Sequence, residues 1–556
     1  MVQGEHETVD VVVVGAGFAG LYALYRLRQL GLSARGFEAG SDVGGVWYWN
    51  RYPGARCDVE SMQYSYSFSE ELQQEWRWTE RFAPQAEILA YLQHVAARFD
   101  LRRDISFETR IEAVRFDEAT DRWTVTTDRR GRVVAQFCLM CTGSISAARV
   151  PEIPGIGEFA GESHHTGDWP HEGVDVAGKR VGVIGTGSSG IQAIPVLARE
   201  AAELVVFQRT PNFIIPARNQ PLDETTERRW KDDYAALRRK AREIGTFYEF
   251  SDRGAMEVSE QEREREYRRR WNEGGVNFVH AYKDIYLDKT SNDTAAAFVR
   301  ARIREMVSDP ERAALLSPTD HPLGSKRICV GSDYYETFNR ESVTLVDLRA
   351  EPIEAITPAG VRTSRREYGL DILVFATGYD ALTGALLRIE VTGRGGERLQ
   401  EKWAGGPQNY LGLMTSGFPN LFIVTGPGSP SVLVNMVIGI EQHVDWIIEC
   451  IASLRGQGMA TIEPARSAEE RWVRHVNDEA NLTLFPRANS WYMGANVPGK
   501  PRVFMPYVGG IGRYRKKCDE VAEAGYAGFV LRGGTGVRAV AELGSTFGEA
   551  GGAVRS

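Results

Sequence analysis

The chain has 556 residues, of which 43% are hydrophobic and 25% charged, an ordinary composition for a globular protein. This length exceeds what one hydrophobic core supports, so we expect two or three domains. The net charge is −8, and the sequence contains no basic stripe of the kind that binds nucleic acid. The most apolar segment, 11–24, is shorter than the ~20 residues of a membrane span. Neither nucleic acid nor a membrane span is therefore expected.

Six scattered cysteines and an acidic, polar N-terminus indicate reduced thiols in the cytoplasm. No metal site is predicted. We expect a monomer whose partners are small molecules.

The first predicted unit binds a nucleotide and opens with the β-branched run VVVV at 11–14. It leads into G-x-G-x-x-G, formed by Gly15, Gly17 and Gly20, then into a helix and an apolar strand that ends at Glu38. In such a unit the helix N-terminus receives a pyrophosphate, and the acidic residue accepts a hydrogen bond from a ribose hydroxyl. The first dinucleotide is therefore FAD or, as the second choice, NAD.

A second unit repeats this order from residue 180, where RVGVIGTGSSG precedes a helix and a strand at 204–208. This strand ends at Arg209, whose guanidinium suits a ribose 2′-phosphate. The second dinucleotide is therefore predicted to be NADPH. A chain that holds a flavin and a hydride donor is predicted to be a redox enzyme.

Later segments are predicted to complete these two units. Residues 222–316 are charged and helical in period, whereas 343–347 and 371–375 read as strands. The turns CTG at 141–143 and ATG at 376–378 let the backbone approach a nucleotide. We predict an α/β fold with two Rossmann-like domains: an FAD domain (8–145 and 388–532), an NADPH domain (146–214 and 323–387), a helical insertion (215–322) and a disordered tail (533–556).

A twelve-residue segment, FAGESHHTGDWP at 159–170, lies between the two glycine-rich motifs and fits the pattern F-x-G-x-x-x-H-x-x-x-W-P. With this signature, the chain resembles the Baeyer–Villiger monooxygenases over residues 8–532. Further matches at 44–58, 426–431 and 490–496 place it nearest the phenylacetone and steroid monooxygenase branch.

The resemblance implies that NADPH reduces FAD and that O₂ then forms a flavin 4a-peroxide, which attacks a ketone carbonyl. The product is an ester or lactone from an aryl, cyclic or steroid-like ketone, with sulfoxidation as a possible side activity. Negatively charged oxygen must be stabilised without being protonated, and a guanidinium suits that task.

Functional residues are carried over from the family by position. Arg327 matches the catalytic arginine, which also faces NADPH, and Asp58 matches the carboxylate that holds it beside FAD. Arg209, Thr210 and Lys326 match the group that grips the 2′-phosphate. Positions that match the FAD lining are Val46, Trp47, Trp49, Tyr64 and Met436. Positions that match NADPH contacts are Arg56, Cys57, Thr186, Gly187, Ser188, Ser189, Gly190, Gln192 and Trp491.

Other positions are assigned structural parts or depart from the family. His165 and Trp169 match a linker between the nucleotide domains and are interpreted as structural. Ala19 replaces a hydroxyl residue of some relatives. Cys329 and Gly331 are smaller than expected behind Arg327, which puts rate and substrate scope in question.

Three alternatives share parts of this pattern. A flavin N- or S-hydroxylating monooxygenase would end the central signature in Tyr and lack Arg327. A disulfide reductase would use Cys138 and Cys141, yet positions three apart on a strand point to opposite faces. A flavoprotein module without oxygenation would need neither Asp58 nor the Lys326-Arg327 pair.

Overall fold

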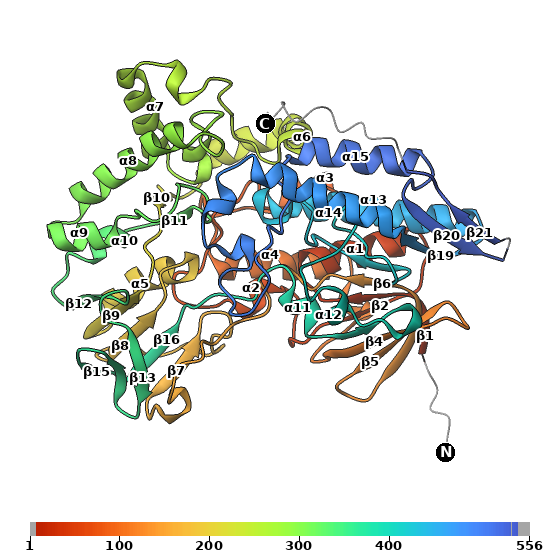
Figure 1. Ribbon diagram of the computed structural model, residues 1–556, viewed down its shortest axis with the longest axis horizontal. Coiled ribbons are helices and arrows are strands. Elements are labelled where there is room, and N and C mark those ends of the chain that lie inside the picture. Colours follow the sequence, from red (N-terminus) through yellow and green to blue (C-terminus); the bar gives the residue numbers. More distant parts are fainter. Residues whose placement is uncertain (1–6, 535, 543–556) are drawn as a thin grey trace.

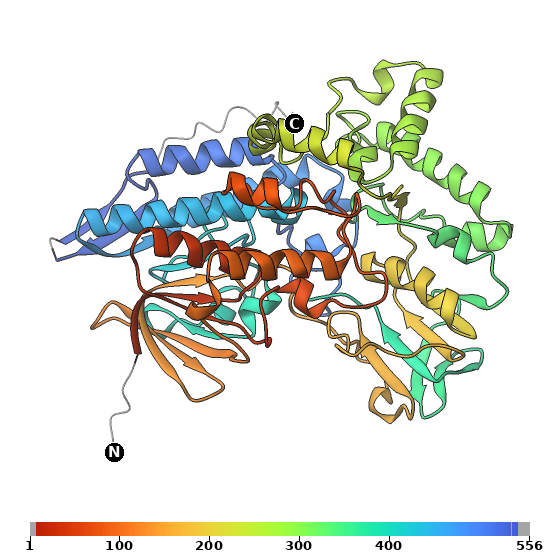
Figure 2. The ribbon, with the colours of Figure 1, turned by 180° about the vertical axis from the view of Figure 1, so that it is seen from behind.

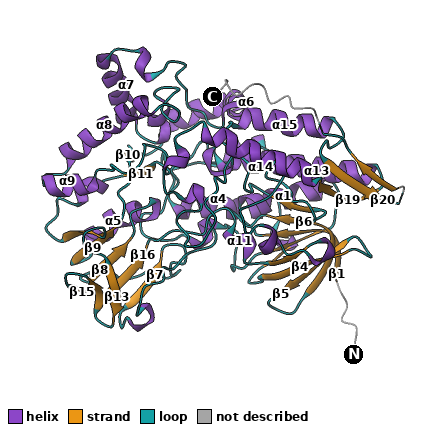
Figure 3. Cartoon of the chain, in the orientation of Figure 1, coloured by secondary structure: helices purple, strands orange, loops and turns teal. Residues whose placement is uncertain are grey.

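The computed structural model describes residues 7–534 and 536–542. Two α/β units lie side by side, and a layer of helices spans them on one side (Figure 1; Figure 3). The predicted fold class, with two Rossmann-like units, is confirmed.

The first sheet has eight strands in the order β17-β4-β5-β6-β1-β2-β3, with β18 paired to β6. Pairing is parallel around β1 and antiparallel through β4, β5 and β6. The strands are β1 (Glu7–Val14), β2 (Ala34–Phe37), β3 (Ile105–Ser106), β4 (Ile111–Asp117), β5 (Arg122–Thr127), β6 (Arg132–Met140), β17 (Glu390–Thr392) and β18 (Leu421–Ile423).

The second sheet is wholly parallel, in the order β12-β9-β8-β16-β7. Its strands are β7 (Glu162–His165), β8 (Arg180–Ile184), β9 (Glu203–Gln208), β12 (Val343–Asp347) and β16 (Ile372–Phe375). Smaller sheets comprise β10 (Ile214–Pro216) with β11 (Cys329–Gly331), β13 (Ile353–Thr357) with β14 (Gly360–Thr363) and β15 (Glu367–Gly369), and β19 (Met459–Pro464) with β20 (Phe529–Gly533) and β21 (Gly536–Ala539).

Helices cover both sheets, and α6 to α9 fill the stretch between β10 and β11. The helices are α1 (Phe18–Gln29), α2 (Val46–Trp49), α3 (Glu70–Glu75), α4 (Gln85–Arg98), α5 (Ser188–Glu200), α6 (Glu224–Ile244), α7 (Glu260–Glu273), α8 (Lys289–Met306), α9 (Pro310–Leu316), α10 (Tyr334–Thr337), α11 (Gly384–Leu387), α12 (Leu399–Lys402), α13 (Met436–Gly456), α14 (Arg466–Asn481) and α15 (Ile511–Glu523). No helix in the described part of the chain combines the length and apolar character needed to cross a bilayer.

The β-branched run at the start of β1 forms the centre of the first unit. Val11, Val12 and Val13 are fully buried, and α1 and α4 pack in the same core cluster as Val11 and Val13. Seen from behind, these two helices lie across the same side of that unit (Figure 2). A strand buried on both faces reads as a continuous hydrophobic run, which explains the unbroken valines.

The predicted tail from residue 533 is wrong for the part that the structure describes. Strand β20 extends to Gly533 and β21 pairs with it antiparallel, with Arg532 opposite Val537. The backbone hydrogen bonds of this hairpin compensate for its glycine-rich composition. Residues 543–556 lie outside the described residues.

Candidate active site

A cavity of about 900 Å³ lies where the parallel strands of the two sheets end and the connections from both converge. All the predicted cofactor and catalytic residues line it except Gly20 and Gly190. Ligands of open α/β sheets bind at the carboxyl ends of the strands, so this is the expected position for two dinucleotides.

The first glycine turn is shaped for close approach. Gly15 has φ +103°, and a Cβ there would lie 2.5 Å from the carbonyl oxygen of Cys141. A Cβ at Gly20 would lie 1.8 Å from the Gly15 carbonyl oxygen, so this third glycine serves helix–strand packing and does not face the cavity. Glu38 accepts hydrogen bonds from the amides of Ala16 (2.9 Å) and Gly40 (2.8 Å). Its carboxylate is thereby fixed beside the turn and retains lone pairs for a ribose hydroxyl.

Aromatic side chains line the same side of the cavity. Helix α2 carries Val46, Trp47 and Trp49, and the Trp47 indole N–H donates to the Tyr64 hydroxyl at 3.2 Å. Met436 is the first residue of α13 and also lines the cavity. These residues form an apolar wall next to the first glycine turn, which fits a flat, ring-containing cofactor.

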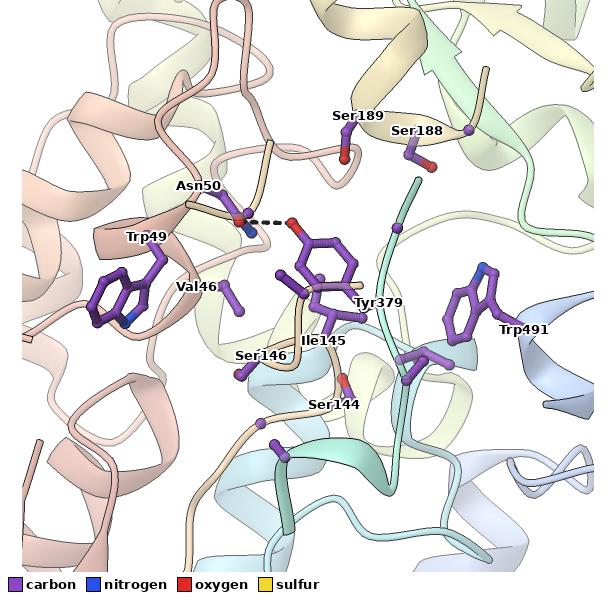
Figure 4. A pocket seen from close by; sticks show the side chains of 18 of the residues that line it. Val46, Trp49, Asn50, Ser144, Ile145, Ser146, Ser188, Ser189, Tyr379 and Trp491 are labelled. Atoms are coloured by element: carbon purple, nitrogen blue, oxygen red, sulfur yellow. Dashed lines mark hydrogen bonds between the residues drawn. The ribbon is translucent and has the colours of Figure 1, made fainter. Parts of the chain in front are cut away.

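The second glycine turn repeats the geometry of the first. A Cβ at Gly185 would lie 2.4 Å from the Ala376 carbonyl oxygen, and one at Gly190 would lie 2.3 Å from the Gly185 carbonyl oxygen. The space around Gly187 is open, and Ser188 and Ser189 lie at the N-terminus of α5 facing the cavity (Figure 4). A helix N-terminus of this kind suits a pyrophosphate.

Two cations lie beyond this turn. Arg209 and Thr210 follow β9, Lys326 comes from the segment before β11, and all three line the cavity. Burial lowers the pKa of Lys326, and the charge of Arg209 lowers it further, although Asp320 opposes the shift. Thr186 donates to the Thr210 carbonyl at 3.0 Å and ties the glycine turn to this pair. The cluster suits an anion such as a 2′-phosphate.

Arg327 lines the same cavity as the two glycine turns and is held by Asp58. Its Nε and Nη2 donate to the two carboxylate oxygens, each at 2.8 Å, and its Nη1 donates to the Val432 carbonyl at 2.9 Å. Burial opposes the charge of Arg327, but Asp58 raises the pKa of the guanidinium well above its usual value. The geometry therefore supplies a fixed positive charge that does not release a proton.

Gln192 joins the two units beside Arg56 and Cys57. Its amide donates to the Arg56 carbonyl at 3.1 Å and its oxygen accepts from Tyr52 at 2.8 Å. The Arg56 guanidinium donates to Glu80 and to the Phe82 carbonyl, both at 2.8 Å. Side-chain contact of Arg56 with a nicotinamide would require a change in this pairing.

Trp491 reaches the cavity from the segment between α14 and α15. Its ring lies 4.3 Å from that of Tyr492, and the indoles of Trp491 and Trp49 lie on opposite sides of the cavity in Figure 4.

His165 lies in β7 and accepts a hydrogen bond from the Gly167 amide at 2.9 Å, and burial lowers its pKa. Trp169 is buried in the core of the second unit.

The cysteine prediction agrees with the register of β6. Cys138 and Cys141 are both free and buried, but only Cys141 lines the cavity.

Cys329 lies behind Arg327, with its sulfur 3.5 Å from the Ser188 hydroxyl oxygen. A Cβ at Gly331 would lie 3.0 Å from Ile191 Cδ1, so a larger residue would push against the end of the Ile191 side chain. No group of metal ligands occurs within residues 7–534 and 536–542.

Several lining residues were not identified from the sequence. They share positions at the ends of strands or in the connections that meet between the sheets: Asn50, Ser144, Ile145, Ser146, Arg149, Asn212, Tyr379 and Asn496. The CTG and ATG turns at 141–143 and 376–378 pointed to part of this set.

Comparisons with known proteins cover nearly the whole chain. A family model described as flavin-binding monooxygenase-like matches residues 8–230. A protein of Pseudooceanicola batsensis named Baeyer-Villiger monooxygenase is 42% identical over 94% of this chain and 96% of its own length. Phenazine N-monooxygenase PhzNO1 of Lysobacter antibioticus is 42% identical over 96% of this chain and 98% of its own length. A solved structure of oxidized steroid monooxygenase bound to NADP is 54% identical, with a TM-score of 0.91, covering 95% of this chain and 100% of that one.

Proposed function

The chain belongs to the Baeyer–Villiger monooxygenases, FAD-dependent enzymes that use NADPH and O₂ to convert ketones to esters or lactones, and we propose how its residues divide that work. The observation that carries the proposal is the Arg327–Asp58 pair, which lies in one cavity with both dinucleotide turns. When bound, FAD takes up a hydride from NADPH and activates O₂ for attack on the ketone carbonyl.

Arg327 is proposed as the catalytic residue. Its partly buried guanidinium stabilises negative charge that develops on oxygen, and its raised pKa prevents it from donating a proton. Asp58 holds the guanidinium plane through two parallel hydrogen bonds, an arrangement that fixes direction as well as position. The hydrogen bond to the Val432 carbonyl occupies a third nitrogen of the guanidinium.

The remaining residues are proposed to hold the cofactors. Glu38, the turn at Gly15 and Gly17, and the aromatic wall of α2 bind FAD. Ser188 and Ser189 bind the NADPH pyrophosphate, and the 2′-phosphate lies between Arg209, Thr210 and Lys326, with Trp491 facing the nicotinamide side. The carboxylate of Glu38 suits a ribose hydroxyl as donor, and the charges of Arg209 and Lys326 suit a phosphate.

We propose an aryl, cyclic or steroid-like ketone as the substrate. The apolar side chains of Val432, Val434, Met436 and Trp491 line the cavity near Arg327, and one structural relative is a steroid monooxygenase. One chain supplies the whole site, which supports action as a monomer, and six free, buried cysteines support a cytoplasmic location. Size-exclusion chromatography of the purified enzyme tests whether it is a monomer.

The function is tested by NADPH oxidation in air with purified FAD-loaded protein and a ketone panel, with products identified by mass spectrometry. The panel contains phenylacetone, cyclohexanone, a long-chain ketone, progesterone and a thioether. We expect an ester or lactone one oxygen heavier than its ketone. Sulfoxide without any ester would instead support an N- or S-hydroxylating enzyme.

Arg327→Ala tests the assigned catalytic role. We expect NADPH still to reduce the flavin, because the hydride donor and acceptor sites remain, while ester formation is lost. Anaerobic flavin reduction and product yield are measured on the same preparation. A normal ester yield from this variant would remove Arg327 from catalysis.

A further inference from the structure

Tyr379 lies in the cavity but has no part in the roles assigned above. It follows β16, one of the strands of the second sheet, directly after the ATG turn. Figure 4 shows its ring within the cavity, below Ser188 and Ser189, with its hydroxyl directed at Asn50. The Tyr379 hydroxyl donates to the Asn50 side-chain oxygen at 2.7 Å.

This hydrogen bond connects the two dinucleotide-binding sides. Asn50 directly follows the last residue of α2, and α2 carries part of the apolar wall beside the first glycine turn. Tyr379 belongs to the strand ends of the second sheet. The bond therefore joins the wall beside one proposed cofactor to the edge of the sheet that binds the other.

The segment after β16 also holds the loop that bears Trp491, residues 489–500, which we call the Trp491 loop. The Asn496 side-chain amide donates to the Tyr379 carbonyl at 2.7 Å. Lys500 donates to the Asp380 carboxylate at 2.5 Å and to the Ala381 carbonyl at 3.0 Å. Three hydrogen bonds thus attach residues 496–500 to residues 379–381.

The ring of Tyr379 is fixed by the central signature. A Cβ at Gly167 would lie 2.7 Å from Tyr379 Cε1, and the His165 ring packs edge-on at 5.9 Å. Burial raises the pKa of the Tyr379 hydroxyl, so the proton that it donates to Asn50 stays in place at physiological pH. The donor is therefore constrained in position and in protonation.

We propose that Tyr379 is a positioning residue that couples the Trp491 loop to α2, so that NADP(H) held under the loop sets the distance between the two dinucleotide turns. The connection runs from Asn496 to the Tyr379 carbonyl, then from the Tyr379 hydroxyl to Asn50 and α2. It rests on the proposed function, because it requires both cofactors to occupy this cavity.

Hydrogen–deuterium exchange of the FAD-loaded enzyme, with and without NADP⁺, tests the coupling. In the native enzyme NADP⁺ is expected to protect peptides from both 489–500 and 46–52. Tyr379→Phe removes only the hydroxyl, so we expect protection at 489–500 to remain. Protection at 46–52 is expected to fall about fivefold, the change that one net hydrogen bond supports.

Three further variants separate coupling from general damage. Asn50→Asp keeps an acceptor oxygen and is expected to retain protection of 46–52, whereas Asn50→Leu is expected to lose it as Tyr379→Phe does. The double variant Tyr379→Phe with Asn50→Leu should lose no more protection at 46–52 than Tyr379→Phe alone, because the hydroxyl that donates to Asn50 is already absent. Tyr410→Phe is the matched control, since it removes another buried tyrosine bond, to the Ala527 carbonyl at 3.3 Å, away from the cavity.

Turnover provides a second readout that a purely structural role would not move. Tyr379→Phe is expected to raise the peroxide formed per NADPH several-fold, with a smaller change in the KM for NADPH. The proposal is overturned if 46–52 is protected equally in native and Tyr379→Phe enzyme, or is not protected in either. Because exchange needs no ketone, coupled protection in an enzyme that forms no ester would reject the proposed function and keep the coupling.

Discussion

Removing the two cations at the proposed 2′-phosphate site should change the choice of nicotinamide cofactor. The perturbation is Arg209→Ala together with Lys326→Ala. Both residues line the cavity, and the charge of Arg209 lowers the pKa of Lys326, so we expect one 2′-phosphate to contact both. NADH carries a hydroxyl where NADPH carries the phosphate, and it should lose little.

The magnitude follows from the contacts that the phosphate loses. A hydrogen bond to a charged group contributes about 1.5–3 kcal/mol. The two cations would share one phosphate, so their contributions do not add in full, and removing either one relieves the repulsion between them. A total of about 3 kcal/mol is therefore reasonable, which corresponds to about 150-fold in kcat/KM for NADPH.

Anaerobic stopped-flow reduction of the FAD-loaded variant by NADPH and by NADH measures the ratio directly. Arg199→Ala is the matched control, because this arginine lies near the end of α5, 3.9 Å from Asp333, and does not line the cavity. An equal loss with both cofactors would refute the reasoning, since it would mean that the cations do not distinguish the phosphate.

Three further outcomes are expected. The pKa of Lys326 is lowered by burial and by Arg209, so the KM for NADPH should rise as pH climbs toward 10.5, while that for NADH stays flat; a flat NADPH profile in native enzyme would contradict this, and Lys326→Ala should flatten it. Gly15→Ala places a side chain at φ +103° against the Cys141 carbonyl, at a strain of about 1–3 kcal/mol, so flavin absorbance per protein should drop; full FAD content would be evidence against the tight turn. Burial raises the pKa of the Cys138 and Cys141 thiols, so iodoacetamide at neutral pH should leave both unmodified in the folded enzyme, as peptide mass spectrometry would show; rapid labelling of both would revive the dithiol alternative.

The parts of the site predicted from the sequence are those encoded within short segments. A strand, glycine turn and helix are contiguous, so Gly15, Glu38 and Arg209 could be assigned to nucleotide binding from spacing alone. The Arg327–Asp58 pair joins residues far apart in the chain and became visible in the sequence only through resemblance to the family. The Tyr379–Asn50 bond had no signal, because neither residue type at its position specifies the other.

The fold shows the same division between local and distant information. Parallel strands with β-branched runs were identified, whereas β13, β14 and β15 are short and were not. The glycine-rich composition around 533–536 suggested disorder, but the hairpin is stabilised by β19, whose residues Met459–Pro464 lie far earlier in the chain. Composition alone cannot report such a partner.

The pairing of β18 with β6 has a consequence for how the protein is made. Leu421, Phe422 and Ile423 lie beside Cys138, Leu139 and Met140, so the first sheet is finished only after the second unit has been synthesised. Until then the nascent chain exposes the edge of an apolar strand, which favours pairing with other chains. Chains that terminate before residue 421 should therefore accumulate as aggregates, which sedimentation of such truncated chains would show.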